Sequence, residues 1–499
     1  MDRVSSRHEG DLDGRLAPLS ASRPARVALW LPPDVAAEPA CQHTAWMLVN
    51  LLARSEGIVE NVVLMCPEGV RLAGRTVPLA RRNVDLASAL IAGAAAVDTV
   101  PVALVSSPPP SADVRFVIGP GEPVEEWRRV HGERWWGGLT SGPMPGTCDS
   151  ALPLGPYTAA CLAAAEVFRA VRVPGYQRLD NAFYSLASFI AFARPPTEAD
   201  DLGPPRLDGL RVRATLAGVG AVGSTWVHTA WATPGISGRA VLADADELGV
   251  DVTNLNRCPV FARSSIGKRK ATEAAAVCED APIVWDPHDG PVGSATGREP
   301  LMLSAVDTNT SRQAVQSLYP ARLISASTLD MRAEVLRCDP RAGTACIRCF
   351  NPPETGPSGH ELRRRFLAMP KEQQESLAAE LGATMEEAHA WAREGVCGYV
   401  GDRLAATMRP STDGAGAFAV GFVSVMAGLM LAAQTFHEAM GTGPLIGATS
   451  RAVMTLLNPV AQSNYPRPFG RQADCPMCDP CTAASTIWRR RYEDANRPT

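Results

Sequence analysis

The sequence predicts an α/β fold made of two Rossmann-like units, of which the second carries the chemistry. Three observations support this prediction. Apolar segments of strand and helix length alternate along the chain, a glycine-rich turn follows a strand at residues 218–223, and two C-x2-C pairs lie in the C-terminal third. A chain of 499 residues, 46% hydrophobic and 20% charged, is long enough for two or three globular domains.

The composition argues against several classes of partner. A net charge of −4 gives no reason to expect nucleic acid or an acidic membrane surface. Residues 1–25 lack the apolar core of a signal peptide and are predicted to form a polar, disordered tail, so we expect a cytoplasmic protein. The uncharged run at 415–433 is rich in Gly, Ala and Ser, and no basic cluster flanks it. We therefore expect a buried core helix and no membrane partner.

The first unit, residues 26–200, is predicted to be a degenerate, inactive Rossmann-like domain. The segment after its first strand, PPDVAAEP, contains no glycine, so the phosphate-binding turn is missing. Its last helix contains CLAAAEVF, which resembles LMLAAQTF at 429–436 and indicates either an internal repeat or a chance likeness between Ala/Leu-rich helices. Strands are expected at 26–32, 58–66 and 114–119, and helices at 41–54 and 155–171.

A Pro-rich, acidic linker at 193–209 precedes the second unit. Apolar residues recur at helical spacing at 361–395, which predicts two or three amphipathic helices between the cysteine pairs. A strand and its turn are expected at 210–220, and further strands of the second unit at 239–246, 299–307, 323–327 and 333–338. The predicted domains are a tail at 1–25, the degenerate unit at 26–200, an active unit at 203–353 and 401–481, a helical insert at 354–400 and a C-terminal tail at 482–499.

The glycine-rich turn has Gly218, Gly220 and Gly223 in G-x-G-x-x-G spacing between a strand and a helix. Such a turn binds nucleotide phosphates, although a tight turn without a ligand has the same spacing. The next strand ends in Asp244 and Asp246, whose carboxylates can accept hydrogen bonds from ribose hydroxyls. These features fit NAD and ATP equally well.

Two cations after this turn favour ATP. Arg257 follows Asn254, and Lys270 lies thirteen residues after Arg257. A dehydrogenase has little need of two fixed cations here, whereas an enzyme that cleaves ATP between the α- and β-phosphates must neutralise the departing pyrophosphate. A solvated basic face is the alternative interpretation, mainly for Lys268 and Arg269.

The motifs G-x-G-x-x-G, D-x-D, N-L-N-R and I-G-x-x-K resemble the ThiF/MoeB superfamily, which includes the ubiquitin-activating enzymes. The resemblance covers about 203–349 and 396–481; it departs at Cys258, where the family has Gln, and in a slightly longer loop before Asn254. It implies that Asp307, at the end of a strand, holds Mg2+, unless this residue only caps the next helix. It also implies that ATP is bound by the glycine turn, Asp244, Asp246, Asn254, Arg257 and Lys270.

The two C-x2-C pairs resemble the zinc-binding pairs of the same superfamily. Four thiolates complete a tetrahedral, structural zinc site with no open position. Cys481 is a competing ligand with poorer spacing. We therefore expect Zn2+ bound by Cys346, Cys349, Cys475 and Cys478.

Cys397 is the only cysteine in the sequence between the two pairs. Ubiquitin-activating enzymes carry in this region a cysteine that accepts the acyl group as a thioester, so the resemblance implies this role for Cys397. A buried, inert thiol is the alternative. Because members of the superfamily pair two units, the degenerate unit is the expected partner of the active one, Arg54 is a candidate for reaching the ATP, and a homodimer stays open.

The sequence thus predicts a ubiquitin-activating-like enzyme of a bacterial ubiquitin-like conjugation system, a setting that resembles antiphage defence. It would adenylate the C-terminal glycine of a ubiquitin-like protein with Mg-ATP, form a thioester on Cys397 and pass the acyl group to a ubiquitin-conjugating-type enzyme. Three alternatives stay open: an adenylyltransferase for a sulfur-carrier protein or a peptide in cofactor or natural-product biosynthesis, an NAD- or FAD-dependent oxidoreductase with a structural zinc, and a non-enzymatic scaffold.

Overall fold

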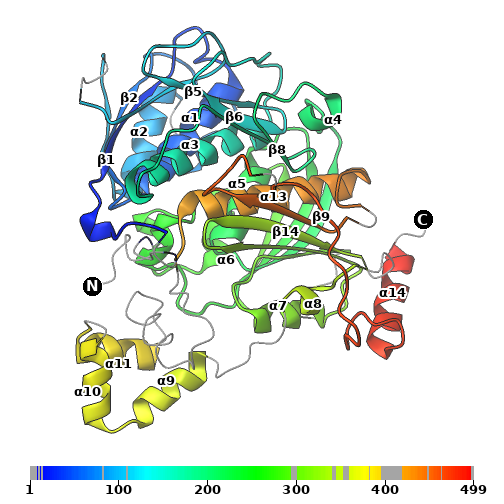
Figure 1. Cartoon of the computed structure of the whole chain (residues 1–499). Helices are drawn as coiled ribbons and strands as arrows, with labels where there is room; N and C mark the ends of the chain where they lie inside the picture. The colour runs from blue at the N-terminus through cyan, green and yellow to red at the C-terminus, as the bar shows by residue number, and fades with distance from the viewer. Residues whose placement is uncertain are drawn as a thin grey trace.

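Two β-sheets lie one above the other, with a layer of helices between them (Figure 1). Both sheets are mixed, and parallel strands form the larger part of each, as the α/β prediction requires. The computed structural model describes residues 8, 12, 15–80, 84–107, 111–293, 300–339, 344–351, 359–380, 383–394, 418–446, 449–461 and 463–495.

The first sheet has the order β3-β2-β1-β4-β5-β6-β7-β8. Strands β1 to β5 are parallel, and β6, β7 and β8 are antiparallel to their neighbours. The chain runs from β1 outward to one edge and then returns to the other side of β1, which is the doubly wound arrangement. Its strands are β1 (Ala25–Trp30), β2 (Val59–Met65), β3 (Val102–Leu104), β4 (Val114–Ile118), β5 (Arg128–Glu133), β6 (Trp136–Thr140), β7 (Asn181–Ser185) and β8 (Ile190–Phe192).

The second sheet repeats this topology in the order β11-β10-β9-β12-β13-β14-β15. Strands β9 to β13 are parallel, and β14 and β15 are antiparallel. Its strands are β9 (Arg211–Ala217), β10 (Ser237–Ala243), β11 (Ile283–His288), β12 (Leu301–Ser304), β13 (Arg322–Leu329), β14 (Arg332–Cys338) and β15 (Arg451–Thr455). The two units therefore share one plan.

The helices with the similar sequences CLAAAEVF and LMLAAQTF occupy equivalent places in this plan. Helix α3 (Leu154–Arg172) lies between β6 and β7 along the chain, and α13 (Gly421–Met440) lies between β14 and β15. Each packs on the strands of its own sheet. This equivalence favours an internal repeat over a chance likeness of two Ala/Leu-rich helices.

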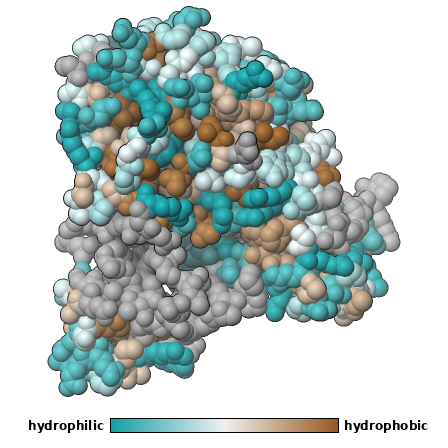
Figure 2. All heavy atoms as spheres, in the orientation of Figure 1, coloured by the Kyte–Doolittle hydropathy of each residue, from teal (hydrophilic) through white to brown (hydrophobic). Residues whose placement is uncertain are grey.

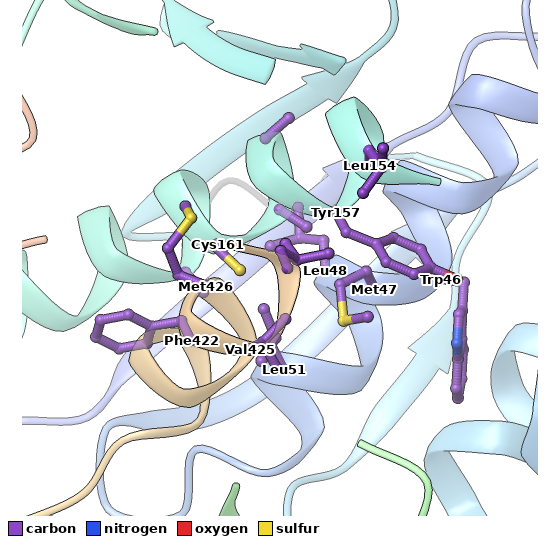
Figure 3. Packing of buried hydrophobic residues seen from close by; sticks show 14 of the residues in the cluster. Trp46, Met47, Leu48, Leu51, Leu154, Tyr157, Cys161, Phe422, Val425 and Met426 are labelled. Carbon is purple, nitrogen blue, oxygen red and sulfur yellow. The ribbon is translucent and has the colours of Figure 1, made fainter. Parts of the chain in front are cut away.

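Four helices fill the space between the sheets: α1 (Pro39–Ala53), α3, α5 (Ala221–Ala232) and α13. Helix α1 packs on α3, α5 packs on α13, and α3 packs on α13. Figure 3 shows Leu48 and Leu51 of α1 close to Val425 and Met426 of α13, with Tyr157 of α3 beside them. Burial between two sheets explains the uncharged run of α13. No helix in the described part of the chain has the length and apolarity needed to cross a membrane.

Three further helices between the cysteine pairs form a small group to one side of the second sheet (Figure 1). Leu362 and Phe366 pack against Ala378 and Ala388 in a small apolar cluster of their own, and the surface of this group in Figure 2 is largely hydrophilic. These helices agree with the two or three predicted from the spacing of apolar residues. They are α9 (Gly359–Ala368), α10 (Lys371–Glu380) and α11 (Met385–Glu394).

Both predicted tails contain ordered, packed residues, so these two predictions were wrong for the part described. Leu16 is buried in the core, and the backbone carbonyl of Ala17 accepts a hydrogen bond of 2.7 Å from Arg172. At the other end, Trp488 is buried and donates a hydrogen bond of 2.7 Å to the Pro320 carbonyl. The remaining helices are α2 (Leu86–Val97), α4 (Ala199–Leu202), α6 (Lys270–Val277), α7 (Asn309–Gln316), α8 (Ile347–Phe350) and α14 (Ala483–Ala495).

Candidate functional site

The candidate nucleotide site lies where three strands of the second sheet end side by side. Ala217, the last residue of β9, pairs with Ala243 of β10 on one side and with Ser304 of β12 on the other. The chain leaves β9 toward β10 and later returns to β12, so this is the switch point at which open α/β sheets bind ligands. Gly218 and Asp244 directly follow the ends of β9 and β10, and Asp307 follows the end of β12 by three residues.

The three glycines of the turn differ in what a side chain at each position would contact. Gly218 has a φ of +89°, and a Cβ there would lie 2.8 Å from the Ala305 carbonyl oxygen. A Cβ on Gly223 would lie 2.0 Å from the Gly218 carbonyl oxygen. A Cβ on Gly220 would meet no described atom within 4 Å. The fold therefore explains Gly218 and Gly223, whereas Gly220 leaves open space at the start of α5, where a phosphate group could approach the backbone.

Asp244 holds the glycine turn from the end of the neighbouring strand. Its Oδ2 accepts a hydrogen bond of 2.7 Å from the Val219 N–H, and its Oδ1 accepts one of 3.0 Å from the Asp246 N–H. Burial raises the pKa of the Asp244 carboxyl, although Lys270 and these two N–H groups oppose the shift. Asp246 is more accessible, with 38% of its side chain exposed. Asp246 is therefore better placed than Asp244 to meet a ribose.

Lys270 begins helix α6 and points back to the same strand end. Its Nζ forms an ion pair with Asp246 Oδ2, and only about a tenth of the side chain is exposed. Burial alone would lower the pKa of Lys270, but the nearby carboxylates of Asp244 and Asp246 outweigh it and raise the pKa above its ordinary value. The structure thus places the Lys270 ammonium beside Asp246 at the end of β10, and its contact with ATP phosphates stays a prediction.

Arg257 and Asn254 lie in a tight helical turn, the 3-10 helix Val252–Asn256, and its C-terminal end. The Asp251 carboxylate accepts from the Asn254 N–H, and Asn254 Oδ1 accepts from the Asp251 N–H at 3.1 Å, so the Asn254 side chain caps the turn. The Arg257 guanidinium donates a hydrogen bond of 2.6 Å to the Thr253 carbonyl. The structure thus gives Asn254 a local structural role, and its contact with a nucleotide stays a prediction.

Arg54, the candidate arginine from the first unit, is buried against the loop that contains Arg257. The residue is 1% exposed, and burial lowers its pKa to about 9, so it is charged at neutral pH. It holds the loop on both sides of Arg257, and its predicted contact with ATP stays a prediction. Its donors bind Asn50 Oδ1 at 2.7 Å and the carbonyl oxygens of Leu255, Pro259 and Phe261 at 2.8, 3.1 and 2.8 Å.

Other residues that support this loop were not singled out from the sequence. His8 is buried; its Nδ1 lies 3.0 Å from the Glu56 carbonyl oxygen, and its Nε2 lies 3.4 Å from Asn256 Nδ2. A Cβ on Gly421, at the start of α13, would lie 2.8 Å from the Asn256 carbonyl oxygen. A lone histidine in a polar tail and a glycine in an apolar run carry no sequence signal for such contacts.

Asp307 is exposed in the turn between β12 and α7. Helix α7 is capped by Thr308, whose Oγ1 accepts from the Ser311 N–H at 3.1 Å, so Asp307 is not needed as the cap. An accessible carboxylate offers the oxygen ligands that Mg2+ prefers. The arrangement is therefore compatible with the predicted metal-binding role.

The four paired cysteines meet although the two pairs are far apart in the sequence. Cys346, Cys349, Cys475 and Cys478 are buried, and their Sγ atoms all lie within 4.8 Å of one another. Individual Sγ–Sγ distances are 3.4 to 3.9 Å, close to the edge of about 3.8 Å expected for four thiolates around Zn2+. The Gln472 N–H donates a hydrogen bond of 3.3 Å to Cys349 Sγ. Cys481 is exposed and does not join this cluster.

Cys397, the predicted acyl acceptor, lies outside the described residues. The described helices α9 to α11 precede it in the chain. Cys258, at the position where the sequence departs from the family pattern, is completely buried next to Arg257. Its thiol therefore fills space in the core of the loop, where burial raises its pKa.

Residues 201–285 match the ThiF family. A relative described as uncharacterized protein y4jF of Sinorhizobium fredii is 26% identical over 412 residues, which cover 74% of this chain and 75% of that protein. The chain is also similar to two crystal structures of E. coli MccB, one with MccA-N7isoASN and one with succinimide. Their identities are 14% and 13% and their TM-scores 0.35 and 0.33, and the alignments cover 54% of this chain and 66% and 67% of the MccB chains.

The matched segment contains β9, the glycine turn, α5, β10, Asp244, Asp246, Arg257 and Lys270. The match therefore covers the part of the site around β9 and β10, and it ends before β12 and Asp307. This segment of the chain is therefore similar to the ThiF family.

Proposed function

We propose that the protein is an ATP-dependent adenylating enzyme, with the nucleotide at the carboxyl ends of β9, β10 and β12. One observation carries the proposal: a glycine turn with open space at Gly220, the Lys270–Asp246 ion pair and the exposed carboxylate of Asp307 converge on one switch point. A dinucleotide-dependent oxidoreductase would use the turn but not the buried cation beside it.

In the proposed reaction a carboxylate oxygen of the substrate attacks the α-phosphorus of ATP. The new O–P bond forms while the bond from this phosphorus to the bridging oxygen breaks, so pyrophosphate leaves with its electron pair and an acyl-adenylate remains. Lys270 and Arg257 stabilise the charge that grows on the departing pyrophosphate. Lys270 exchanges its carboxylate partner Asp246 for phosphate oxygens. Asp307 would hold Mg2+, which neutralises phosphate charge when bound.

We further propose that the attacking carboxylate is the C-terminal glycine of a ubiquitin-like protein. The Cys397 thiolate then attacks the acyl carbon, a thioester forms, AMP leaves, and a ubiquitin-conjugating-type enzyme receives the acyl group. Two features support this choice: the helices α9 to α11 inserted between the cysteine pairs, and a second unit paired with the active one. Adenylation of a sulfur-carrier protein or a peptide needs neither feature.

We propose Zn2+ at the four-cysteine cluster, with a structural role. The metal would join the segment around α8 to the segment that precedes α14, because each contributes one C-x2-C pair. A closed set of four sulfur ligands leaves no position for a substrate. Described cysteines that form no disulfides also support a reducing, cytoplasmic location.

The test of adenylation is ATP–pyrophosphate exchange in the presence of a glycine-terminated ubiquitin-like protein. Lys270→Ala and Asp307→Ala should each lower the exchange rate by at least about a hundredfold. Lys268→Ala is the matched control, because Lys268 pairs with Glu273 and half of its side chain is exposed. Wild-type exchange in both site variants would contradict the assignment of the site.

The thioester is tested by a DTT-sensitive adduct between the protein and the ubiquitin-like protein. The adduct should be lost in Cys397→Ala while pyrophosphate exchange is retained. Exchange without any adduct would instead support the sulfur-carrier or peptide alternative, and bound flavin or nicotinamide-dependent turnover would support an oxidoreductase.

A further inference from the structure

A cavity of 480 Å³ lies where the first unit, the linker and helix α13 come together. Its wall is formed by the turn between β7 and β8, by α4 with the linker residues that follow it, and by the C-terminal end of α13 with the loop after it. Figure 1 shows α4 on the same side of the molecule as this end of α13. A cavity of this size can hold a small organic molecule.

The charged and dipolar groups of the wall are negative. Asp200 is the one charged side chain among the described lining residues, and its carboxylate has no hydrogen bond or ion pair with any described residue. Met440, the last residue of α13, brings the carbonyl end of a long helix to the cavity, and this end carries partial negative charge. The nearby charge of Glu438 is already matched by Arg337 at 2.7 Å. The cavity therefore favours a positively charged ligand.

His437 adds a hydrogen-bond acceptor to this wall. It is 5% exposed, and its Nε2 lies 3.2 Å from the Leu186 carbonyl oxygen. A carbonyl oxygen only accepts, so Nε2 carries the proton in this contact. Burial lowers the pKa of His437 to about 4, so the ring is neutral at pH 7 and Nδ1 is left as an acceptor. Nδ1 is buried and finds no partner in the described part of the chain, which is uncommon for a polar atom.

The His437 ring is fixed by its neighbours. The Trp135 ring packs against it with the ring centroids 4.7 Å apart. Gly443 lies at the Nδ1 side, with a φ of +115°, and a Cβ there would lie only 2.7 Å from Nδ1. A residue with a side chain does not fit this position. Because Gly443 also lines the cavity, a donor in the cavity approaches Nδ1 past a residue that has no side chain.

The rest of the wall suits a short aliphatic chain. Ala187, Met440 and Pro444 are apolar lining residues. Ser188 is a further polar one, and its Oγ is buried without a partner among the described residues, so it can accept a hydrogen bond. A metal ion is a weaker explanation, because across the ranges that the structure describes only the four-cysteine cluster brings three or more His, Cys, Asp or Glu ligand atoms together.

We propose that this cavity binds a small aliphatic amine, with the ammonium group directed to Asp200 and to Nδ1 of His437, and the carbon chain against the apolar wall. An ammonium group donates hydrogen bonds and accepts none, so it matches a wall of acceptors. A carboxylate or a phosphate meets only acceptors and like charge there. Since both units and the linker form the cavity, a bound amine stabilises their contact. The proposal does not depend on the proposed adenylation.

The test is isothermal titration calorimetry of the full-length protein with butylamine. Butanol and butyrate are the matched compounds, because they keep the carbon chain and change the polar group. We expect saturable binding of butylamine that weakens as sodium chloride is added, and a melting temperature that rises with butylamine concentration. Butyrate should not bind. The proposal is overturned if butylamine shows no saturable binding at millimolar concentration, or if butanol binds as tightly as butylamine.

The role of the carboxylate is tested by Asp200→Asn, which should weaken butylamine binding by about fivefold, because the pair is exposed to solvent. Asp201→Asn is the matched control, since it removes the same charge one residue further along and Asp201 is not among the lining residues. It should leave the affinity unchanged. Both substitutions keep the shape of the side chain, and circular dichroism checks the fold. Equal affinities in the two variants would show that Asp200 does not bind the amine.

The role of the histidine is tested without a substitution in the wall. Nitrogen NMR of the protein with isotope-labelled histidine reports each ring nitrogen, and the spectrum of His437→Gln serves only to assign the His437 signals. Butylamine should shift the Nδ1 signal of His437, because this nitrogen gains a donor. If binding leaves that signal in place, the amine lies elsewhere and the assignment of the cavity is wrong.

Discussion

The two units have the same strand order but differ at the connection between the first strand and the first helix. In the second unit only residues 218–220 join β9 to α5, whereas in the first unit residues 31–38, without a glycine, join β1 to α1. The short turn brings backbone N–H groups and the start of a helix to the strand ends. The longer connection does not. The two units thus share one plan, while the proposed nucleotide binding depends on a few positions at the carboxyl ends of central strands.

The contact through Arg54 is the strongest test of how the two units depend on each other. Arg54→Ala leaves the carbonyl groups of Leu255, Pro259 and Phe261 buried without their donor. We expect a loss of about 3 kcal/mol or more in the free energy of unfolding, measured by urea denaturation. We also expect a raised KM for ATP, because Arg257 follows Leu255. An unchanged KM in a folded Arg54→Lys variant would show that the first unit does not position this loop.

The glycine turn allows the needs of the fold and of the ligand to be separated. Gly223→Ala brings a methyl group within 2.0 Å of a backbone oxygen, and we expect it to destabilise the protein by about 1–3 kcal/mol. Gly220→Ala meets no described atom within 4 Å and should leave the melting temperature unchanged while it weakens ATP binding. Thermal melts with and without ATP check both. If Gly220→Ala binds ATP as tightly as the wild type, the phosphates do not lie at this turn.

Buried histidines between the units predict a dependence of stability on pH. Burial lowers the pKa of His43 in α1 to about 4 and that of His228 in α5 to about 3. In the unfolded chain the pKa values of these histidines are near 6.5. Between pH 6.5 and pH 4 the unfolded chain therefore binds more protons than the folded chain. Stability is full above pH 6.5 and falls as the pH falls toward 4.

The size of this effect can be measured on one residue. Between pH 7 and pH 5.5, the free energy of unfolding should fall by about 1 kcal/mol less in His43→Gln than in the wild type, because glutamine cannot titrate. Urea denaturation of both proteins at the two pH values gives this difference. An equal loss in variant and wild type would mean that His43 is not buried in its neutral form.

A second arginine that crosses between the units should matter least. Arg263 binds Asp98 through an ion pair of 3.0 Å, but half of the Arg263 side chain and 74% of the Asp98 side chain are exposed. Arg263→Ala should cost less than about 1 kcal/mol, because solvent screens the pair. It is the matched control for Arg54→Ala. A cost similar to that of Arg54→Ala would contradict the view that burial makes the Arg54 contact important.

The sequence predicted those parts of the fold and site that depend on local patterns. The strand–glycine–helix unit around Gly218 and the apolar helix α13 lie where expected, whereas β10 ends at Ala243, before the Asp244 and Asp246 that were expected to end this strand. The two C-x2-C pairs form one four-cysteine cluster, as their spacing predicted. The helices α9 to α11 also followed from apolar spacing.

Long-range contacts could not be predicted in this way. The sequence marks Arg54 as a charged residue near a helix end, and only the fold shows that it binds carbonyl groups of the other unit. The predicted C-terminal tail contains α14, where Trp488 is buried and donates a hydrogen bond to the Pro320 carbonyl. The spacing of apolar residues does not indicate this contact.

The link between the units has a consequence for how the protein responds to concentration. Trp135 Nε1 donates to the Pro204 carbonyl at 3.1 Å, and Ser150 Oγ donates to the Pro205 carbonyl at 2.9 Å, so the first unit holds the connecting segment at two adjacent residues. Two separate subunits would come apart on dilution, whereas a tethered pair keeps a constant effective concentration of one unit for the other. Because both units are parts of one chain, every molecule contains one glycine turn and one supporting unit, and the ratio of the two units stays one to one at any protein concentration.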